Sequence, residues 1–131
     1  MDVSNKLVLI VDAETSLLQA LNRLFGSSGF EVTTARTPEE AMSFDRAPDF
    51  ALIDVMLHGM NGVDLARKLA ERWGSLQIVF ITDGCPIELR QQAEKIGPIL
   101  GKPFVYNELL GVVDHFIDLS AKPVEATASA L

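Results

Sequence analysis

The sequence predicts an α/β fold in which a parallel five-stranded sheet is covered on both faces by five helices. Two observations indicate this class. Five short apolar runs alternate with segments whose apolar residues recur at helical spacing, and no internal repeat interrupts them. The first run, Leu7–Val11, is continuously apolar, as is typical of a strand buried on both faces. Hydrophobic residues make up 48% of the chain, which is enough for a sizeable core.

Each element has its own signal along the chain. Strands are predicted at Leu7–Val11, Phe30–Ala35, Phe50–Ile53, Gln77–Ile81 and Ile99–Leu100. Helices are predicted where apolar residues recur at helical spacing. These stripes are Leu17, Leu18, Leu21, Leu24 and Phe25, which stops at Gly29; Ala66, Leu69, Ala70 and Trp73; and Leu109, Val113, Phe116 and Ile117. Two further helices are predicted, one from the start signal Thr37-Pro38-Glu39-Glu40 and a weaker one over about Pro86–Ile96. In the start signal, Thr37 is the expected N-cap, Pro38 takes the first helical position and Glu40 closes a capping box.

The alternation of elements also constrains the topology. Right-handed crossovers leave few arrangements, and the flavodoxin-like strand order 2-1-3-4-5 is the expected one. We expect one domain over residues 1–119, because 131 residues are too few for two cores, and a flexible polar tail over residues 120–131. Ligands of such sheets bind at the carboxyl ends of the strands, so the residues after each strand are the candidates for a site.

Composition argues against several functions. The formal charge is 11 − 18 = −7 and no Lys/Arg cluster is present, which argues against nucleic acid as a partner. Cys85 is the single cysteine, so neither a disulfide framework nor a cysteine metal cluster can form. The run Leu7–Val11 is too short for a signal peptide or a membrane span, so we expect a cytoplasmic protein without a membrane partner.

Polar residues follow the predicted strands at the edge where ligands are expected. They are Asp12 and Glu14 after the first strand, Asp54 after the third, Thr82 and Asp83 after the fourth, and Lys102 after the fifth. Each alone has an ordinary interpretation as a cap, a turn residue or a solvated lysine, but together they indicate a site. Clustered carboxylates repel one another and should favour a hard cation, Mg²⁺ in particular. A carboxylate beside that cation can attack phosphorus to form an acyl phosphate, whose oxygens Thr82 and Lys102 could hold.

These residues stand in four separated motifs that occur in a characteristic order. The motifs are Leu7-Val8-Leu9-Ile10-Val11-Asp12-Ala13-Glu14, Leu52-Ile53-Asp54-Val55-Met56-Leu57-His58-Gly59-Met60-Asn61-Gly62, Ile81-Thr82 and Lys102-Pro103-Phe104. Over about residues 6–119 the chain therefore resembles the receiver domain of two-component response regulators.

The resemblance implies a function and a set of roles. It implies phosphotransfer to Asp54 from a histidine kinase, a phosphotransfer protein or a small phosphodonor, with no enzymatic activity beyond self-catalysed phosphotransfer and dephosphorylation. It implies that Mg²⁺ is held by Asp12, Asp54 and the main-chain carbonyl of Met56. It further implies that Thr82 and Lys102 bind the phosphoryl group, and that the Lys102–Pro103 peptide bond is cis.

Four positions depart from the family pattern. Ala13 replaces a second aspartate that usually binds the metal, and Asp83 replaces a small residue. Ile99 replaces an aromatic residue that takes part in activation, and His58 replaces a proline; Tyr106 is not expected to substitute for that aromatic residue. The missing carboxylate at Ala13 should make Mg²⁺ binding weak unless Asp83 or Glu14 compensates. Alternatively, Asp83 pairs with Lys102 and inhibits the site, and the sequence leaves these alternatives open.

Two functions follow from this pattern. The first is a single-domain response regulator that accepts phosphate on Asp54 and signals through protein–protein contacts. The alternative is a pseudo-receiver that works as an interaction module independently of phosphorylation. An aspartate-nucleophile phosphohydrolase fits less well, because Met56 stands where that class has its second acid. A nucleotide-binding module also fits poorly, because no glycine-rich loop follows the first strand.

Overall fold

The computed structural model describes residues 6–120, and the side chains of residues 6–115. Five strands and five helices alternate along this part of the chain. The strands are β1 (Leu7–Val11), β2 (Glu31–Ala35), β3 (Phe50–Asp54), β4 (Gln77–Thr82) and β5 (Ile99–Gly101). The helices are α1 (Thr15–Ser27), α2 (Pro38–Met42), α3 (Gly62–Arg72), α4 (Ile87–Glu94) and α5 (Tyr106–Ser120). The predicted tail at 121–131 lies outside the described residues.

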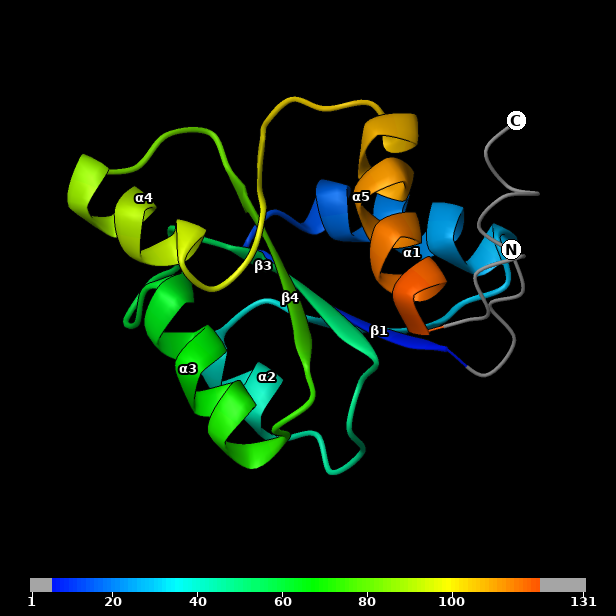
Figure 1. Ribbon diagram of the computed structural model, residues 1–131, viewed down its shortest axis with the longest axis horizontal. Helices are drawn as coiled ribbons and strands as arrows, with labels where there is room; N and C mark the ends of the chain where they lie inside the picture. Colours follow the sequence, from blue (N-terminus) through cyan, green and yellow to red (C-terminus); the bar gives the residue numbers. More distant parts are fainter. Residues whose placement is uncertain (1–5, 121–131) are drawn as a thin grey trace.

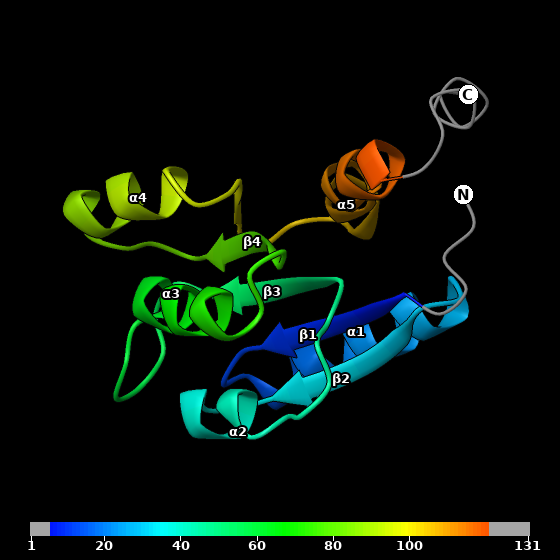
Figure 2. The ribbon, with the colours of Figure 1, turned by 60° about the horizontal axis from the view of Figure 1, so that its bottom comes forward.

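All strand pairs of the sheet are parallel, and the order is β2-β1-β3-β4-β5. The predicted strand order is therefore confirmed. Helices α1 and α5 lie on one face of the sheet, and α2, α3 and α4 lie on the other (Figure 1). Figure 2 shows the arrowheads of β1 to β4 pointing to the same side, so their carboxyl ends form one edge of the sheet.

The sheet separates two hydrophobic cores because successive side chains of a strand point to opposite faces. In β1, Val8 and Ile10 pack toward α1 and α5, whereas Leu9 and Val11 pack toward α2, α3 and α4. All five residues of β1 are buried, which explains why this strand is continuously apolar. The stripe predicted for the last helix contributes buried Leu109 and Val113. The side chains of Phe116 and Ile117, from the same stripe, lie outside the described residues.

Local signals set most of the element ends. The chain leaves α1 through Gly29, whose φ of 101° suits glycine, and the Phe30 N–H then donates to the Phe25 carbonyl at 3.1 Å. Strand β2 therefore starts at Glu31, one residue later than predicted. The predicted α4 is shorter than expected and occupies Ile87–Glu94.

The predicted helix start at Thr37 is present with one difference. The Thr37 hydroxyl accepts a hydrogen bond from the Glu40 N–H at 3.1 Å, as an N-cap does. The Glu40 carboxylate, however, accepts from the Arg36 N–H at 2.6 Å, and a true capping box would use the N–H of Thr37 itself. Within residues 6–120, no helix is both long and apolar enough to cross a membrane.

Candidate functional site

The carboxyl edge of the sheet gathers the polar residues that the sequence singled out. Asp12 follows β1, Asp54 ends β3 and Thr82 ends β4, and their exposed fractions are 1%, 8% and 3%. Among the described residues these are the buried polar or charged ones, and Lys102 reaches them from the end of β5. Polar groups are buried at a cost unless they are paired, so this cluster is the candidate site.

A single ammonium group joins the two buried carboxylates. The Lys102 Nζ lies 2.7 Å from Asp12 Oδ2 and 3.2 Å from Asp54 Oδ2. The second oxygen of each carboxylate accepts a backbone hydrogen bond from two residues further along the chain. Asp12 Oδ1 accepts from the Glu14 N–H at 2.8 Å, and Asp54 Oδ1 accepts from the Met56 N–H at 3.1 Å. Both carboxylates are thus fixed in place at two points.

Thr82 and Lys102 are held side by side by the backbone. The Lys102 N–H donates to the Thr82 carbonyl at 2.7 Å, which continues the pairing of β4 with β5. The Thr82 hydroxyl accepts from the Gly84 N–H at 3.0 Å and so closes the turn that leaves β4. Gly84 has a φ of 139°, a conformation that side chains disfavour. The Lys102–Pro103 peptide bond is cis, as the resemblance implied.

Gly62, for which the sequence suggested no role of its own, supports the segment that carries Asp54. Its N–H donates to the Val55 carbonyl at 2.7 Å. A Cβ at Gly62 would lie 2.1 Å from the Asp54 carbonyl oxygen, so only glycine allows helix α3 to start this close to β3. Helix α3 is capped by Asn61, whose side chain accepts from the Asp64 N–H at 2.8 Å. The sequence analysis predicted this helix from the stripe of Ala66, Leu69, Ala70 and Trp73 and did not identify its start; Asn61, a residue type that favours the N-cap position, is the signal that could have indicated it.

The pKa values of Asp54 and Lys102 are both raised, for different reasons. Burial raises the pKa of Asp54, and Asp12 adds to this, while the Met56 N–H and Lys102 oppose it without cancelling it. Burial alone would lower the pKa of Lys102, but the hydrogen bond to Asp12 and the charges of both aspartates outweigh it, so the net shift is also upward. The surroundings of Lys102 therefore favour its cationic form, and those of Asp54 disfavour its ionised form.

The remaining acidic candidates lie outside this cluster. Glu14 and Asp83 are exposed, and they line a cavity of about 330 Å³ that also reaches Lys102. Within residues 6–115, the ion-pair partners of Lys102 are Asp12 and Asp54, so the alternative in which Asp83 pairs with Lys102 is not observed. Met56 is 47% exposed beside the cluster.

The positions that depart from the family pattern have different surroundings in the structure. The Ala13 carbonyl accepts a hydrogen bond from Arg36 Nη2 at 3.4 Å, and His58 is exposed in the loop after β3. Ile99 packs into the core beneath α2, α3 and α4, whereas Tyr106 packs on the opposite face of the sheet. There its hydroxyl lies 3.1 Å from Ser28 Oγ. Tyr106 therefore cannot take the place of an aromatic residue at Ile99.

The donor set at this edge contains oxygens of the kind that Mg²⁺ prefers. Carboxylate and carbonyl oxygens are its preferred ligands, and one or two carboxylates suffice when water completes the shell. Asp12, Asp54 and the Met56 carbonyl supply such oxygens. Within the part of the chain that the structure describes, however, no group of three or more His, Cys, Asp or Glu side chains could hold a metal, and Lys102 already occupies one oxygen of each aspartate.

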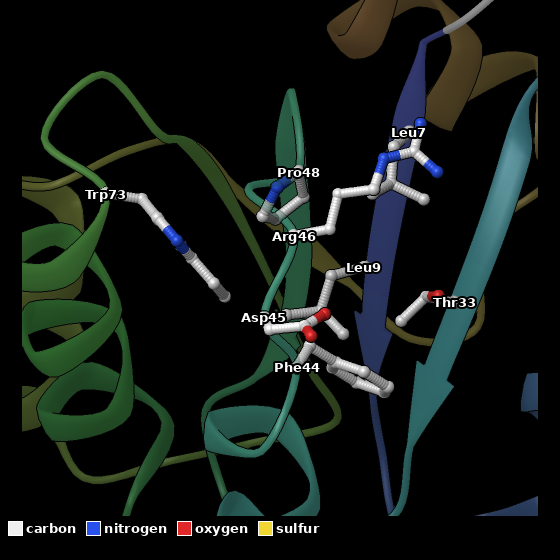
Figure 3. A pocket seen from close by; sticks show the side chains of 8 residues that line it. All are labelled: Leu7, Leu9, Thr33, Phe44, Asp45, Arg46, Pro48 and Trp73. Atoms are coloured by element: carbon white, nitrogen blue, oxygen red, sulfur yellow. The ribbon is translucent and has the colours of Figure 1, made fainter.

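A second cavity, of about 150 Å³, lies at the opposite edge of the sheet, where the strands begin (Figure 3). Its lining residues are Leu7, Leu9, Thr33, Phe44, Asp45, Arg46, Pro48 and Trp73. The guanidinium of Arg46 is paired with Glu31 at 2.5 Å. Since the wall is mostly apolar and far from Asp54, this cavity is separate from the acidic site.

Comparison with known proteins places these features in a family. The family model of the response regulator receiver domain matches residues 8–114. The sporulation initiation phosphotransferase F of Bacillus subtilis (strain 168) is 22% identical over 121 residues, which cover 89% of this chain and 98% of that protein. The response regulator protein TmoT of Ectopseudomonas mendocina is 30% identical over 129 residues, which cover 95% of this chain and 59% of that protein.

Solved structures share the fold of this chain. The CheY-like response regulator receiver domain protein from Methanospirillum hungatei JF-1 matches with a TM-score of 0.82 and 25% sequence identity, covering 88% of this chain and 95% of that one. A two-component response regulator from Clostridium difficile also gives a TM-score of 0.82, at 21% identity, over 90% of this chain and 100% of that one.

Proposed function

Since the chain belongs to the response regulator receiver domain family of two-component signalling, we propose that Asp54 is its phosphoacceptor. The observation that carries this proposal is the contact of Lys102 with both Asp54 and Asp12, at 3.2 and 2.7 Å, beside the hydroxyl-bearing Thr82. This arrangement presents a carboxylate, an ammonium group and a hydroxyl at one edge of the sheet, which are the groups that phosphoryl transfer to a carboxylate requires.

In the proposed reaction, a carboxylate oxygen of Asp54 attacks the phosphorus atom of the donor. The bond between phosphorus and the leaving group breaks, and the leaving group departs with the electron pair, giving an acyl phosphate on Asp54. The Lys102 ammonium already contacts Asp54, so it is placed to form charge-assisted hydrogen bonds to the transferred phosphoryl oxygens. The Thr82 hydroxyl, at the end of the neighbouring strand, would donate a further one.

Mg²⁺ would be held by Asp12, Asp54 and the main-chain carbonyl of Met56. When bound, the ion supplies positive charge that offsets the negative charge gathered by the carboxylates and the incoming phosphoryl group. With Ala13 in place of a third carboxylate, we expect this binding to be weak.

The proposed phosphodonor is a histidine kinase or a phosphotransfer protein, and the phosphorylated domain would act by contacting a protein partner in the cytoplasm. The related phosphotransferase F matches along nearly its whole length, which supports a role in phosphoryl transfer. The proposed chemistry comprises phosphotransfer to Asp54 and dephosphorylation, in which water cleaves the acyl phosphate to inorganic phosphate and the free Asp54 carboxylate.

Intact mass spectrometry tests the proposal directly. Incubation with Mg²⁺ and acetyl phosphate should add one phosphoryl group to the wild type and none to Asp54→Asn, which keeps the shape of the side chain. If the wild type gains no mass with a saturating donor and with a phosphorylated histidine kinase, Asp54 is not a phosphoacceptor. The chain would then act as a phosphorylation-independent interaction module.

A further inference from the structure

The approach to Lys102 is lined by negative charge. The cavity of about 330 Å³ beside Lys102 is bounded by Glu14, Leu17, Asp83, Lys102, Pro103 and Phe104. Asp83 directly follows the buried Thr82, yet its own side chain is exposed. A phosphodonor that approaches Lys102 through this cavity therefore comes close to the Asp83 carboxylate.

The ammonium group of Lys102, which lines this cavity, is already paired with carboxylates. Lys102 is bound to Asp12 and Asp54, so the cluster of one ammonium and two carboxylates carries a net negative charge when all three are ionised. Within residues 6–115, no ion pair includes Glu14 or Asp83; Glu14 accepts a hydrogen bond from the Ser16 hydroxyl at 3.1 Å. The two carboxylates at the mouth are thus without a cation partner in the described part of the chain.

We propose that Asp83 is a specificity-determining residue that makes the site discriminate against strongly anionic phosphodonors. The inference rests on the proposed acceptance of phosphate by Asp54. Repulsion between Asp83 and a donor grows with the charge of the donor. Phosphotransfer from a small acyl phosphate with two negative charges is therefore slowed. Phosphotransfer is less affected when the donor's phosphoryl group is surrounded by neutral or positively charged groups. Because Asp83 is exposed, salt should weaken this discrimination.

The position of Asp83 argues against a structural or metal-binding role. Its carboxylate forms no hydrogen bond or ion pair with the described residues, so replacing it should leave the fold intact. It also does not form a metal-binding cluster with Asp12 and Asp54 in that part of the chain. The charge of Asp83 is therefore free to act on molecules that enter the cavity.

Two small donors of different charge provide the test. Initial rates of adduct formation on Asp54 are measured by intact mass with acetyl phosphate, a dianion, and with phosphoramidate, a monoanion. Both reactions are run across a Mg²⁺ titration from subsaturating to saturating concentrations. Asp83→Asn should speed the reaction with acetyl phosphate about threefold to tenfold at low salt. With phosphoramidate, the logarithm of the rate increase should be about half of its value with acetyl phosphate, because the repulsion energy is proportional to the charge of the donor. High salt should reduce both gains.

A matched control removes an exposed negative charge elsewhere on the domain. Glu71 is exposed on α3, outside the cavity, and Glu71→Gln should leave both rates unchanged. Glu14→Gln, at the cavity mouth, should reproduce the pattern of Asp83→Asn to a smaller degree.

Several results would overturn the inference. Equal acceleration with both donors would mean that Asp83 limits access by its size, and no acceleration would mean that its charge does not act on the donor. A slower reaction that high Mg²⁺ restores would identify Asp83 as a metal ligand. These outcomes all require adduct on Asp54, so they leave the proposed function standing. If no variant gains an adduct with either small donor or with a phosphorylated histidine kinase, both the proposed function and this inference are refuted.

Discussion

Replacing Lys102 by methionine tests the central contact of the site. Lys102→Met keeps a side chain of similar length but removes the ammonium group that lies 2.7 and 3.2 Å from Asp12 and Asp54. The two carboxylates would then be neighbouring, unpaired charges. Their side chains are only 2% and 11% exposed, so water cannot easily replace the lost partner.

The expected cost follows from this burial. Removing one partner of a fully buried ion pair costs about 3–5 kcal/mol. The Lys102 side chain is 14% exposed, and the site can relax toward solvent at its open edge. We therefore expect Lys102→Met to lower the free energy of unfolding by roughly 2–4 kcal/mol at pH 7.5.

The loss should depend on pH with a definite sign. Burial raises the pKa of Asp54 in the folded protein, and removal of Lys102 would raise it further. A group with a raised folded-state pKa contributes stability below its unfolded pKa, and loses that contribution as the pH rises through the folded value. The defect of Lys102→Met should therefore shrink between pH 7.5 and pH 5.

Urea denaturation followed by circular dichroism measures these differences. The double variant Lys102→Met, Asp54→Asn should recover part of the lost stability, because it removes one of the two repelling charges. If Lys102→Met loses less than about 0.5 kcal/mol, the ion pairs do not stabilise the fold. If the loss is the same at both pH values and in both Asp54 backgrounds, repulsion between the carboxylates is not its cause.

Three further predictions follow from other contacts. Ala13→Asp should tighten Mg²⁺ binding by about tenfold to a hundredfold in calorimetry; an unchanged affinity would show that another carboxylate already fills that position. Gly62→Ala places a Cβ 2.1 Å from a backbone oxygen and should cost about 2–4 kcal/mol in urea denaturation. The control Gly111→Ala, with open space in α5, should stabilise by about 0.5–1 kcal/mol; equal effects of the two would refute the steric argument. Burial raises the pKa of Tyr106 in the folded protein. The contribution of this group to stability is therefore present at pH values below the ordinary pKa of tyrosine and is lost as the pH rises above that pKa. Tyr106→Phe should therefore lose less stability than the wild type between pH 9 and pH 11, and parallel curves would contradict this.

The strand order of the sheet, and the residues that meet at its carboxyl edge, could be predicted from the sequence. Strand burial and helical spacing gave the order of elements, and parallel strands bring their carboxyl ends to one edge regardless of side-chain detail. Asp12, Asp54, Thr82 and Lys102 therefore came together as predicted. Their roles in phosphorylation stay predictions until the reaction is measured.

Details set by side-chain packing were beyond the sequence. Whether Lys102 pairs with Asp83 or with the two buried aspartates depends on distances that only the folded loops fix. The hydrogen bond of Glu40 to the Arg36 N–H differs from the expected one by a single residue. The close approach of Gly62 to β3 involves backbone atoms, and no pattern of polar and apolar residues encodes it.

The position of Trp73 has a practical consequence for spectroscopy. It is the single tryptophan of the chain, and it borders the cavity at the edge where the strands begin (Figure 3). The guanidinium of Arg72 stacks over its ring, 4.5 Å from the ring centroid. Tryptophan emission should thus report loss of the tertiary structure around α3 during unfolding. Because the ring lies at the far end of the sheet from Asp54, direct quenching by an ion or a phosphoryl group at the acidic edge is not expected.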